Sequence, residues 1–518
     1  MHPGTHASLT PTRNAAIVGE QSLSYLELDL RSRRLAVALR RRGLERGDSI
    51  AIQLANCCEF FVAAWAAQRS GLYYVPVSTQ LRDEELGFIL GDSGARAFIA
   101  DSTYGAVAAA ALSRLEQPPV LCLMRGDPVE GFNSLAQVLA DESDALHDEV
   151  EGSDMLYTSG TTGRPKGVKR PLTYAALGSD VRRITRMRDL FVMNQDSVFY
   201  TPAPIYHAAP LRFAMTVMRL GGTVVLSEKF DPETALDNLR RHAVTHSQWV
   251  PTMFSRLLRL SDSARASYKF PKHRVAIHSG APCPVDVKQA MIDWWGPVLH
   301  EYYSGTESIG FTHCDSFEWL DNRGTVGRPW GCKVHIVDDD GNELPPGQRG
   351  AVYFEGQAPL VYHNDQEKTR KAHSIQGWAT MGDVGYVNEN DYLFLTDRKA
   401  FTIVSGGVNI YPREIELVLQ THPLVEEAAV FGVPDPEFGE AVQAVVQLLA
   451  PEGASQEIAD LLFDHVRTHL AGFKRPKRID FCAEFPRLSG GKLDKRSLRD
   501  DYMARAHKGF AAETRRHS

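Results

Sequence analysis

Short apolar runs alternate with helix-like segments through most of this 518-residue chain, and the alternation constrains the fold more than any other feature. We expect strands at residues 49–54, 73–77, 96–100, 198–201, 223–226, 247–250 and 275–279. Helices such as those expected at residues 231–242 and 252–260 separate them. This strand–helix rhythm is typical of parallel sheets covered by helices. The sequence therefore predicts an α/β protein whose sheets are mainly parallel.

The first long helix has a recognisable start. Ser24 and Glu27 have the spacing of a capping box, and Gly43 supplies a stop signal. One face of this helix is apolar, with Tyr25, Leu28, Leu35 and Leu39. We expect its arginines to form a solvated face, with contact to an anionic membrane surface as the alternative: Arg31, Arg33, Arg34, Arg40, Arg41 and Arg42.

The chain is too long for one ordinary core, so at least two domains are expected. The pattern changes near residue 400, where a short α+β unit begins: a helix from Pro412, two strands near residues 428–433 and 441–448, and a helix near residues 456–470. We place an N-terminal domain at residues 1–397 and a C-terminal domain at residues 398–518.

Residues 157–168, Tyr-Thr-Ser-Gly-Thr-Thr-Gly-Arg-Pro-Lys-Gly-Val, form a loop suited to phosphate groups. Backbone N–H groups, hydroxyls and the cation of Lys166 are the groups that bind a nucleotide's phosphates. A Walker A loop is excluded because Pro165 precedes Lys166 and Gly167 follows it. The alternative is a flexible polar linker, which has no need of the Pro-Lys-Gly ending.

This segment resembles the signature loop of the adenylate-forming superfamily, which includes acyl-CoA synthetases, peptide-synthetase adenylation domains and luciferases. Four further segments of that family follow in order: Ser279-Gly280-Ala281-Pro282, Glu301 to Glu307, Trp378 to Asp383, and Ser489 to Leu493. The resemblance extends from about Ser24 to Arg496 and is greatest to bacterial acyl-CoA ligases. It implies that the C-terminal domain is mobile.

The resemblance implies that ATP and its AMP product are bound by signature-loop residues, by the adenine-side loop, by an aromatic pair and by two ribose contacts. These residues are Thr158, Ser159, Gly160, Thr161, Thr162, Gly163, Lys166, Gly280, Ala281, Pro282, Tyr302, Tyr303, Asp383 and Arg398. Tyr303 would stack on adenine, and Asp383 and Arg398 would contact the ribose hydroxyls.

Four residues are implied to act on the reacting groups. Glu307 would hold Mg²⁺, which prefers oxygen ligands, and Thr306 would touch the α-phosphate. Lys492 would offset the repulsion between the attacking carboxylate and that phosphate. His207 would lie near the carboxylate and act by position and hydrogen bonding.

The implied reaction has two steps. The carboxylate attacks the α-phosphorus and releases pyrophosphate, and a thiol, that of coenzyme A, then displaces AMP. Between the steps the small domain would rotate. Residues implied to line the coenzyme A site are Ser405, Gly406, Gly407, Phe473, Arg475 and Lys477, although the last three also fit a basic surface loop.

We expect the acid pocket to be lined by His207, Ala208, Phe213, Trp249, Met253, Gly280 and Tyr302. This mixture suits an apolar acid, such as a fatty, steroid-side-chain or aryl acid. The chain departs from the family pattern at Ala400, where a hinge Asp or Lys is usual, at Tyr302, where a smaller residue is usual, and at Lys169-Arg170-Pro171, which follows the signature loop.

The composition excludes other classes of protein. A net charge of −7 argues against a nucleic-acid partner. No apolar run approaches the roughly 18–20 residues of a membrane span, and the N-terminus does not read as a secretory signal. Seven scattered cysteines predict reduced, partly buried thiols in a cytoplasmic protein. The sequence leaves a homodimer open.

Two other functions fit parts of the pattern. An adenylating enzyme could pass its acyl group to a separate carrier protein instead of coenzyme A. A catalytically silent nucleotide-binding protein is disfavoured because Lys166, Glu307, Asp383, Arg398 and Lys492 are all present.

Overall fold

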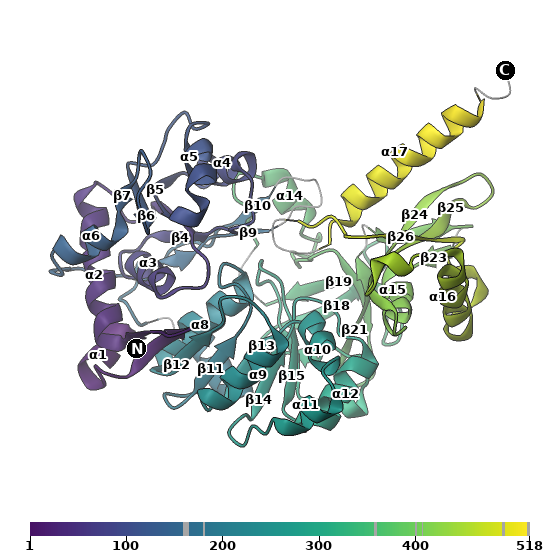
Figure 1. Cartoon of the computed structure of the whole chain (residues 1–518), viewed down its shortest axis with the longest axis horizontal. Coiled ribbons are helices and arrows are strands. Elements are labelled where there is room, and N and C mark those ends of the chain that lie inside the picture. Colours follow the sequence, from purple (N-terminus) through teal and green to yellow (C-terminus); the bar gives the residue numbers. More distant parts are fainter. Residues whose placement is uncertain are drawn as a thin grey trace.

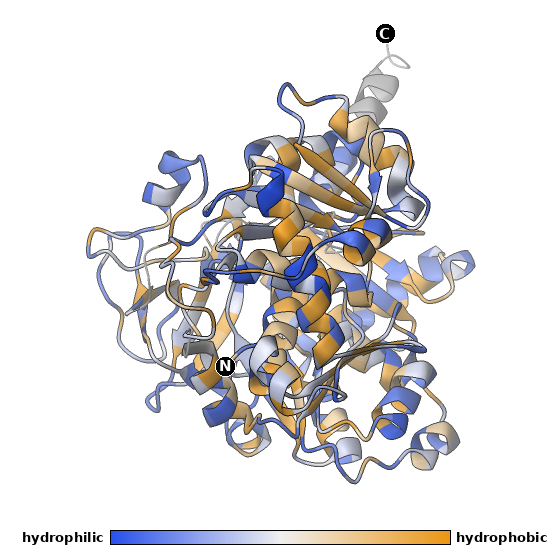
Figure 2. Ribbon diagram, turned by 90° about the vertical axis from the view of Figure 1, so that its left-hand side faces the viewer, coloured by the Kyte–Doolittle hydropathy of each residue, from blue (hydrophilic) through white to orange (hydrophobic). Residues whose placement is uncertain are grey.

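The computed structural model of this chain describes residues 1–158, 165–179, 182–356, 360–398, 401–406, 408–488 and 493–514. Figure 1 shows two large sheet-and-helix parts side by side and a smaller C-terminal part, from which the last helix projects. Hydrophobic residues concentrate on the inner strands and helices, and hydrophilic residues on the outer loops (Figure 2).

A six-stranded sheet in the order β7-β6-β5-β3-β4-β8 forms the core of the N-terminal part. Its neighbouring strands all run parallel. The strands are β3 (Ser49–Gln53), β4 (Tyr73–Pro76), β5 (Ala95–Asp101), β6 (Leu121–Arg125), β7 (Asn133–Ser134) and β8 (Ser153–Asp154). The helices of this part are α1 (Pro3–Leu9), α2 (Tyr25–Arg41), α3 (Cys58–Arg69), α4 (Asp83–Asp92), η1 (Ser102–Tyr104), α5 (Gly105–Leu112) and α6 (Leu135–Asp141).

A nine-stranded sheet, in the order β17-β16-β15-β14-β13-β11-β12-β1-β2, lies beside it, and its strands from β15 to β1 run parallel. Its strands are β1 (Asn14–Val18), β2 (Gln21–Ser24), β11 (Val198–Thr201), β12 (Thr223–Leu226), β13 (His246–Trp249), β14 (Val275–His278), β15 (Leu299–Tyr303), β16 (Thr312–Cys314) and β17 (Arg328–Pro329). The accompanying helices are α7 (Arg182–Phe191), α8 (Ala208–Leu220), α9 (Pro232–Arg241), α10 (Pro251–Leu258), α11 (Asp262–Ser267), α12 (Val285–Trp295) and α13 (Ser316–Asp321).

A four-stranded antiparallel sheet and a short hairpin complete the large domain. The sheet contains β18 (Lys333–Val337), β19 (Gly350–Glu355), β20 (Asp383–Val387) and β21 (Leu393–Arg398), with α14 (Gln366–Lys371) between β19 and β20. The hairpin pairs β9 (Leu156–Thr158) with β10 (Lys166–Val168).

The C-terminal part is a five-stranded sheet with helices. It contains β22 (Ile403–Ser405), β23 (Val408–Ile410), α15 (Pro412–Gln420), β24 (Val425–Asp435), β25 (Gly439–Leu448), η3 (Pro451–Gly453), α16 (Gln456–His469), η4 (Gly472–Lys474), β26 (Arg478–Cys482) and α17 (Lys495–Thr514). The expected α/β class, with a separate small α+β domain, is confirmed, and all seven expected strands are present. The exact domain boundary at residue 397 stays a prediction.

Almost every residue of helix α3 is buried. A helix that is apolar all round is stable only when other elements surround it. Its side chains join those of α2, α8 and the inner faces of both parallel sheets in one hydrophobic core. This core fixes the two sheets relative to each other, and with them the strand ends that carry the candidate site.

The start of α2 follows the sequence prediction. Glu27 N–H donates to Ser24 Oγ over 3.2 Å, and Ser24 N–H donates to Glu27 Oε2 over 2.8 Å. The apolar face of α2 is buried as expected. Gly43 has φ +80°, a conformation that favours glycine after a helix.

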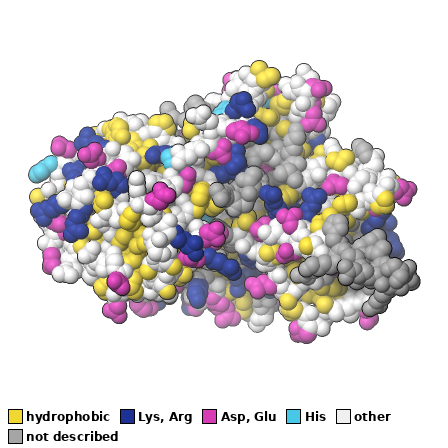
Figure 3. Space-filling model, turned by 90° about the horizontal axis from the view of Figure 1, so that it is seen from above, with side chains coloured by type: hydrophobic (Ala, Val, Ile, Leu, Met, Phe, Trp, Pro, Cys, Tyr) yellow, Lys and Arg dark blue, Asp and Glu magenta, His cyan; other side chains and the backbone are white. Residues whose placement is uncertain are grey.

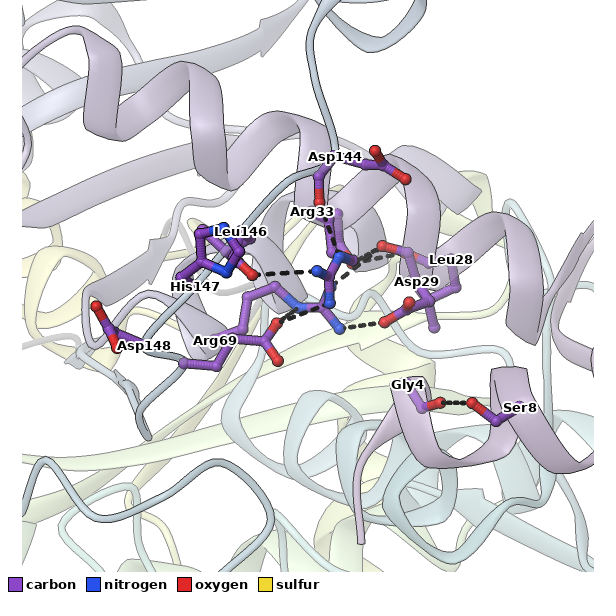
Figure 4. Close-up of polar contacts among 12 residues, drawn as sticks. Gly4, Ser8, Leu28, Asp29, Arg33, Arg69, Asp144, Leu146, His147 and Asp148 are labelled. Atoms are coloured by element: carbon purple, nitrogen blue, oxygen red, sulfur yellow. Dashed lines mark hydrogen bonds and ion pairs between the residues drawn. The ribbon is translucent and has the colours of Figure 1, made fainter.

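The arginines of α2 do not form a simple solvated face, so that expectation is corrected. Arg33 donates to the carbonyl oxygens of Asp144 and Leu146 over 2.9 and 3.1 Å. Nearby, the fully buried Arg69 of α3 pairs with Asp29 over 2.5 Å (Figure 4). Arg34 and Arg40 likewise donate to backbone carbonyls of residues 139 and 147. These guanidinium groups attach residues 139–147 to α2. The acceptors are backbone carbonyl groups, so no side-chain pattern in that segment predicts these contacts.

None of the helices among the described residues combines the length and the apolar character that a membrane-crossing helix needs. All seven cysteines lie in the described part of the chain, and none is in a disulfide bond. Burial raises the pKa of Cys57 to about 12 and that of Cys58 to about 11, so both are thiols at neutral pH.

Two half-buried histidines predict a loss of stability in acid. His300 Nδ1 lies 3.0 Å from His313 Nε2, and burial lowers their pKa values from 6.5 to about 4 and about 3. The unfolded chain therefore takes up protons first, so the free energy of unfolding falls as pH drops from 6.5 through about 4. We expect His300→Gln to flatten this fall, measured by urea unfolding at several pH values. An unchanged slope would contradict the assignment.

Candidate functional site

The candidate residues gather where parallel strands of the nine-stranded sheet end. His207 precedes α8 after β11, the loop from Ser279 to Pro282 follows β14, and Tyr303 ends β15. Ligands of open α/β sheets bind at the carboxyl ends of the strands. Gly280 has φ +87°, so the loop after β14 makes a turn that other residues disfavour. Figure 3 shows Lys and Arg side chains in the middle of the face seen from above and also nearer its edges, with acidic side chains among them.

Tyr303 and Asp383 meet across two sheets. The Tyr303 hydroxyl donates to Asp383 Oδ2 over 2.5 Å, and Asp383 is 8 % exposed. Asp383 begins β20, and Arg398 is its direct partner in the β20–β21 register. The structure therefore brings together the expected adenine-stacking residue and the expected ribose residue, and it places the Arg398 backbone beside them.

Tyr362 connects Lys166 with Glu307 and was missed by the sequence analysis. Its hydroxyl donates to Glu307 Oε1 over 3.1 Å, and Lys166 Nζ lies 5.3 Å from the centre of its ring. The backbone next to Tyr362 pairs with β10, where His363 N–H donates to Gly167 O over 2.8 Å. A cavity of about 480 Å³, lined by Tyr362 and by residues of α14, opens beside this group.

Arg212 of α8 is a second residue that the sequence analysis missed. Its guanidinium donates to Thr306 O over 3.1 and 3.2 Å and to Ser308 Oγ over 2.8 Å. It also pairs with Asp154 over 2.7 Å, and the Asp154 side chain is 1 % exposed. The backbone beside Glu307 is thus fixed by a cation from another element.

Several predicted residues lie outside the described residues: Ser159, Gly160, Thr161, Thr162, Gly163, Gly407 and Lys492. The hinge position Ala400 also lies outside them. Thr158 and Lys166, on either side of the signature loop, are paired in register at the open end of the β9–β10 hairpin. Their roles remain predictions.

The expected acid-pocket residues divide into two groups. Ala208, Phe213 and Tyr302 belong to the core around α8, with the Phe213 and Tyr302 ring centres 5.8 Å apart. Trp249 and Met253 instead pack in the core on the other face of the sheet. Successive residues of a strand point to opposite faces, so Gln248, not Trp249, lies on the side of Tyr302.

Tyr302 itself lies against aromatic and polar groups. Its ring stacks on Phe311 with centres 5.0 Å apart and planes 9° apart. Burial raises its pKa, while hydrogen-bonding interactions with Ser279 and Gln248 oppose the rise. Tyr302 and Tyr303 are consecutive in β15 and point to opposite faces. Tyr303 alone therefore reaches Asp383. His207 is half-buried at the start of α8, with its ring 4.8 Å from that of Tyr206.

Part of the expected coenzyme A region comes together through Phe438. Gly406 N–H donates to Phe438 O over 2.8 Å, and Lys477 Nζ lies 4.9 Å from the Phe438 ring centre. Ser405 pairs with Gly439 in β22–β25. Arg475 instead donates to the backbone carbonyl of Leu470 over 3.0 Å. Phe473, the remaining residue of this region, is exposed.

Within the described part of the chain, no three His, Cys, Asp or Glu side chains lie close enough to form a metal site alone. Glu307 nevertheless fits Mg²⁺ in an ATP complex, because this ion is often held by one or two carboxylates together with substrate phosphates and water.

Removing the Tyr303 hydroxyl tests the nucleotide side of the site. Tyr303→Phe keeps the ring but leaves Asp383 without its 2.5 Å donor. A hydrogen bond to a charged group contributes about 1.5–3 kcal/mol, so we expect KM for ATP to rise about tenfold with little change in KM for the acid. Tyr386→Phe, which alters a tyrosine hydroxyl of β20 elsewhere in the same sheet, is the control. An unchanged KM for ATP would contradict a role for the pair in nucleotide binding.

Two family models match this chain. A family model described as AMP-binding enzyme matches residues 5–360, and one described as AMP-binding enzyme C-terminal domain matches residues 414–492.

Individual relatives match over nearly the whole chain. A feruloyl-CoA synthase from Amycolatopsis sp is 32% identical over 509 residues, covering 96% of this chain and 97% of the relative. A fatty acid–[acyl-carrier-protein] ligase from Streptomyces coeruleorubidus is 31% identical, covering 96% and 95%. The solved structure of an o-succinylbenzoate CoA synthetase from Bacillus subtilis with its acyl-adenylate has a TM-score of 0.82 and 26% identity, covering 96% and 97%.

Proposed function

The chain belongs to the family of AMP-binding enzymes, and from that premise we propose that it is an ATP-dependent ligase joining a carboxylic acid to coenzyme A. The arrangement of Tyr303, Asp383, Lys166, Tyr362 and Glu307 around the strand ends carries the proposal. It supplies an aromatic ring, a ribose acceptor, a phosphate cation and a metal-binding carboxylate in one site.

In the first step, a carboxylate oxygen of the acid bonds to the α-phosphorus of ATP while the bond to the bridging oxygen of pyrophosphate breaks. Lys166 and the signature loop hold the β- and γ-phosphates, and Glu307 would hold Mg²⁺, which neutralises phosphate charge. Thr306 meets the α-phosphate, and Lys492 offsets the negative charge that develops there. His207 lies near the reacting carboxylate.

In the second step, the sulfur of coenzyme A attacks the acyl carbonyl. The thiol loses its proton to solvent, and the bond from the acyl carbon to the AMP oxygen breaks, giving a thioester and AMP. The thiolate is the reactive form. The resemblance assigns coenzyme A contacts to Gly406 and Lys477, which both contact Phe438.

We propose a fatty, steroid-side-chain or aryl acid as the substrate. The aromatic contacts of Phe213, Tyr302 and Phe311 favour an apolar acid, whereas the Gln248 amide makes the same side of the sheet partly polar. The related proteins include a feruloyl-CoA synthase and a fatty acid ligase. The second candidate function, loading of a carrier protein, is favoured by the fatty acid–[acyl-carrier-protein] ligase among the relatives. A silent nucleotide-binding protein is the remaining alternative.

The test is pyrophosphate release from ATP across a panel of fatty, aryl and steroid-side-chain acids, with and without coenzyme A. Repeated turnover that requires coenzyme A and one class of acid would support the ligase and identify its substrate. One stoichiometric burst that coenzyme A does not change, followed by turnover with an added carrier protein, would support the second candidate. No release with any acid would contradict the proposal.

A further inference from the structure

A buried ion pair lies next to the predicted catalytic lysine in sequence. Lys495, the first residue of α17, follows Lys492 by three positions, and its Nζ lies 2.5 Å from Glu416 Oε1. The two side chains are 12 % and 1 % exposed. Burying a charge pair costs desolvation energy, so such a pair often adds little to the free energy of unfolding. The Lys495–Glu416 pair therefore suggests a role other than stability.

The Glu416 carboxylate has a second partner within the small domain. Its Oε1 also accepts the backbone N–H of Val430 in β24 over 2.7 Å. Lys495 Nζ lies 5.2 Å from the ring centre of Phe401, which stands at the beginning of the small domain. The pair therefore joins α15, β24 and the start of α17 at one point.

Arg413, one turn earlier on α15, connects this point to the large domain. Its Nη2 donates to Pro282 O over 3.1 Å, in the loop that follows β14. Its backbone N–H donates to Asp397 Oδ2 over 2.8 Å, and its Nη1 lies 3.8 Å from Glu416 Oε2. Helix α15 is thus attached at its start to the predicted adenine-side loop and to the end of β21.

The described residues on either side of Lys492 are also fixed. Arg487 and Leu493 form a β-bridge, and Asp494 N–H donates to Pro486 O over 2.8 Å. Leu493 packs against the small core around Phe485. The described backbone before and after Lys492 is therefore held together by the contacts of residues 486, 487, 493 and 494, and Lys495 connects it to Glu416.

We propose that Arg413, Glu416 and Lys495 are positioning residues that transmit the docking of the small domain on Pro282 to Lys492, and so favour acyl-adenylate formation. The inference rests on the proposed function. A displacement of about 1 Å at a reacting centre can cost about 10²-fold in rate, so the ion pair that holds the start of α17 matters for a lysine three positions before it in sequence. We expect transfer to coenzyme A to proceed without Lys492, so it should also proceed without the Lys495–Glu416 ion pair.

The experiment measures the two half-reactions separately in Lys495→Met, in Lys495→Arg and in Arg413→Met. Single-turnover adenylation at saturating ATP and acid should fall about 10²-fold in Lys495→Met. Thioester formation from supplied acyl-adenylate and coenzyme A should stay within about twofold. Lys495→Arg keeps the charge and should recover most of the rate. Arg413→Met leaves the small-domain core intact and should show the same division between the steps.

Arg499→Met is the matched control. Arg499 lies one turn after Lys495 on α17 and pairs with Glu440 over 3.5 Å, away from α15. It should leave both half-reactions unchanged. An equal loss of both half-reactions in Lys495→Met, or full activity in Arg413→Met, would overturn the proposal. If the unaltered enzyme adenylates no acid, the proposed function itself fails, and the two failures are therefore distinguishable.

Discussion

Replacing Lys492 with alanine is expected to slow acyl-adenylate formation by about 10²–10³-fold, the usual effect of removing one group that stabilises developing charge. The attacking carboxylate and the α-phosphate are both anionic, so the step needs a cation close to both. Thioester formation from supplied acyl-adenylate lacks this repulsion and is expected to change by less than about threefold.

The measurement is single-turnover formation of acyl-AMP, followed by coenzyme A transfer from a supplied acyl-adenylate. Lys333→Ala is the control, because Lys333 is an exposed lysine of β18 that pairs with Glu355. Survival of both half-reactions in Lys492→Ala would show that the chemistry does not use this lysine. Loss of both, with an unchanged Tm, would extend its role to the second step.

The sequence predicted those features whose signals are local. The capping box of Ser24 and Glu27 and seven strands of the two main sheets depend on residues close together in the chain, and both were predicted correctly. The Tyr303 and Asp383 motifs were recognised separately, but their contact depends on how β15 and β20 are brought together. No local pattern encodes that distance.

The residues expected to line the acid pocket show where sequence patterns fail to predict which face of a strand a side chain occupies. Every residue of β13 is buried, because helices cover both faces of the sheet. Such strands lack the polar–apolar alternation that reveals which face is which. The choice between Gln248 and Trp249 therefore required the register of β13 with its neighbours.

Arg212 and Tyr362 were missed for a related reason. An arginine in an amphipathic helix and a tyrosine in a loop are ordinary features, and their importance comes from partners distant in the chain. The arginines of α2 illustrate the same limit, since their carbonyl acceptors lie about a hundred positions later.

Arg212→Met is expected to lower both stability and activity. Removing one partner of a buried ion pair costs about 3–5 kcal/mol, and the Arg212–Asp154 pair, 14 % and 1 % exposed, is of this kind. The substitution also removes the donors to Thr306 O and Ser308 Oγ. Thr306 and Glu307 would then be held less firmly, and we expect kcat for adenylation to fall about 10²-fold.

Arg219→Met separates the two effects. Arg219 lies two turns later on α8, and it pairs with Glu151 over 2.7 Å, with side chains 8 % and 7 % exposed. Its loss should reduce the free energy of unfolding by a similar amount, measured by urea denaturation, because it breaks the same kind of buried pair. Arg219 does not donate to the 306–308 segment in the described structure. The Arg219→Met enzyme, assayed where it is folded, should therefore keep its kcat.

Equal losses of kcat in the two variants would mean that α8 acts on the site only through overall stability. A loss confined to Arg212→Met would mean that this guanidinium sets the geometry of the residues proposed to meet the α-phosphate and Mg²⁺. The second result is the expected one, because both arginines lie on α8 and each pairs with a buried carboxylate, whereas only Arg212 contacts Thr306.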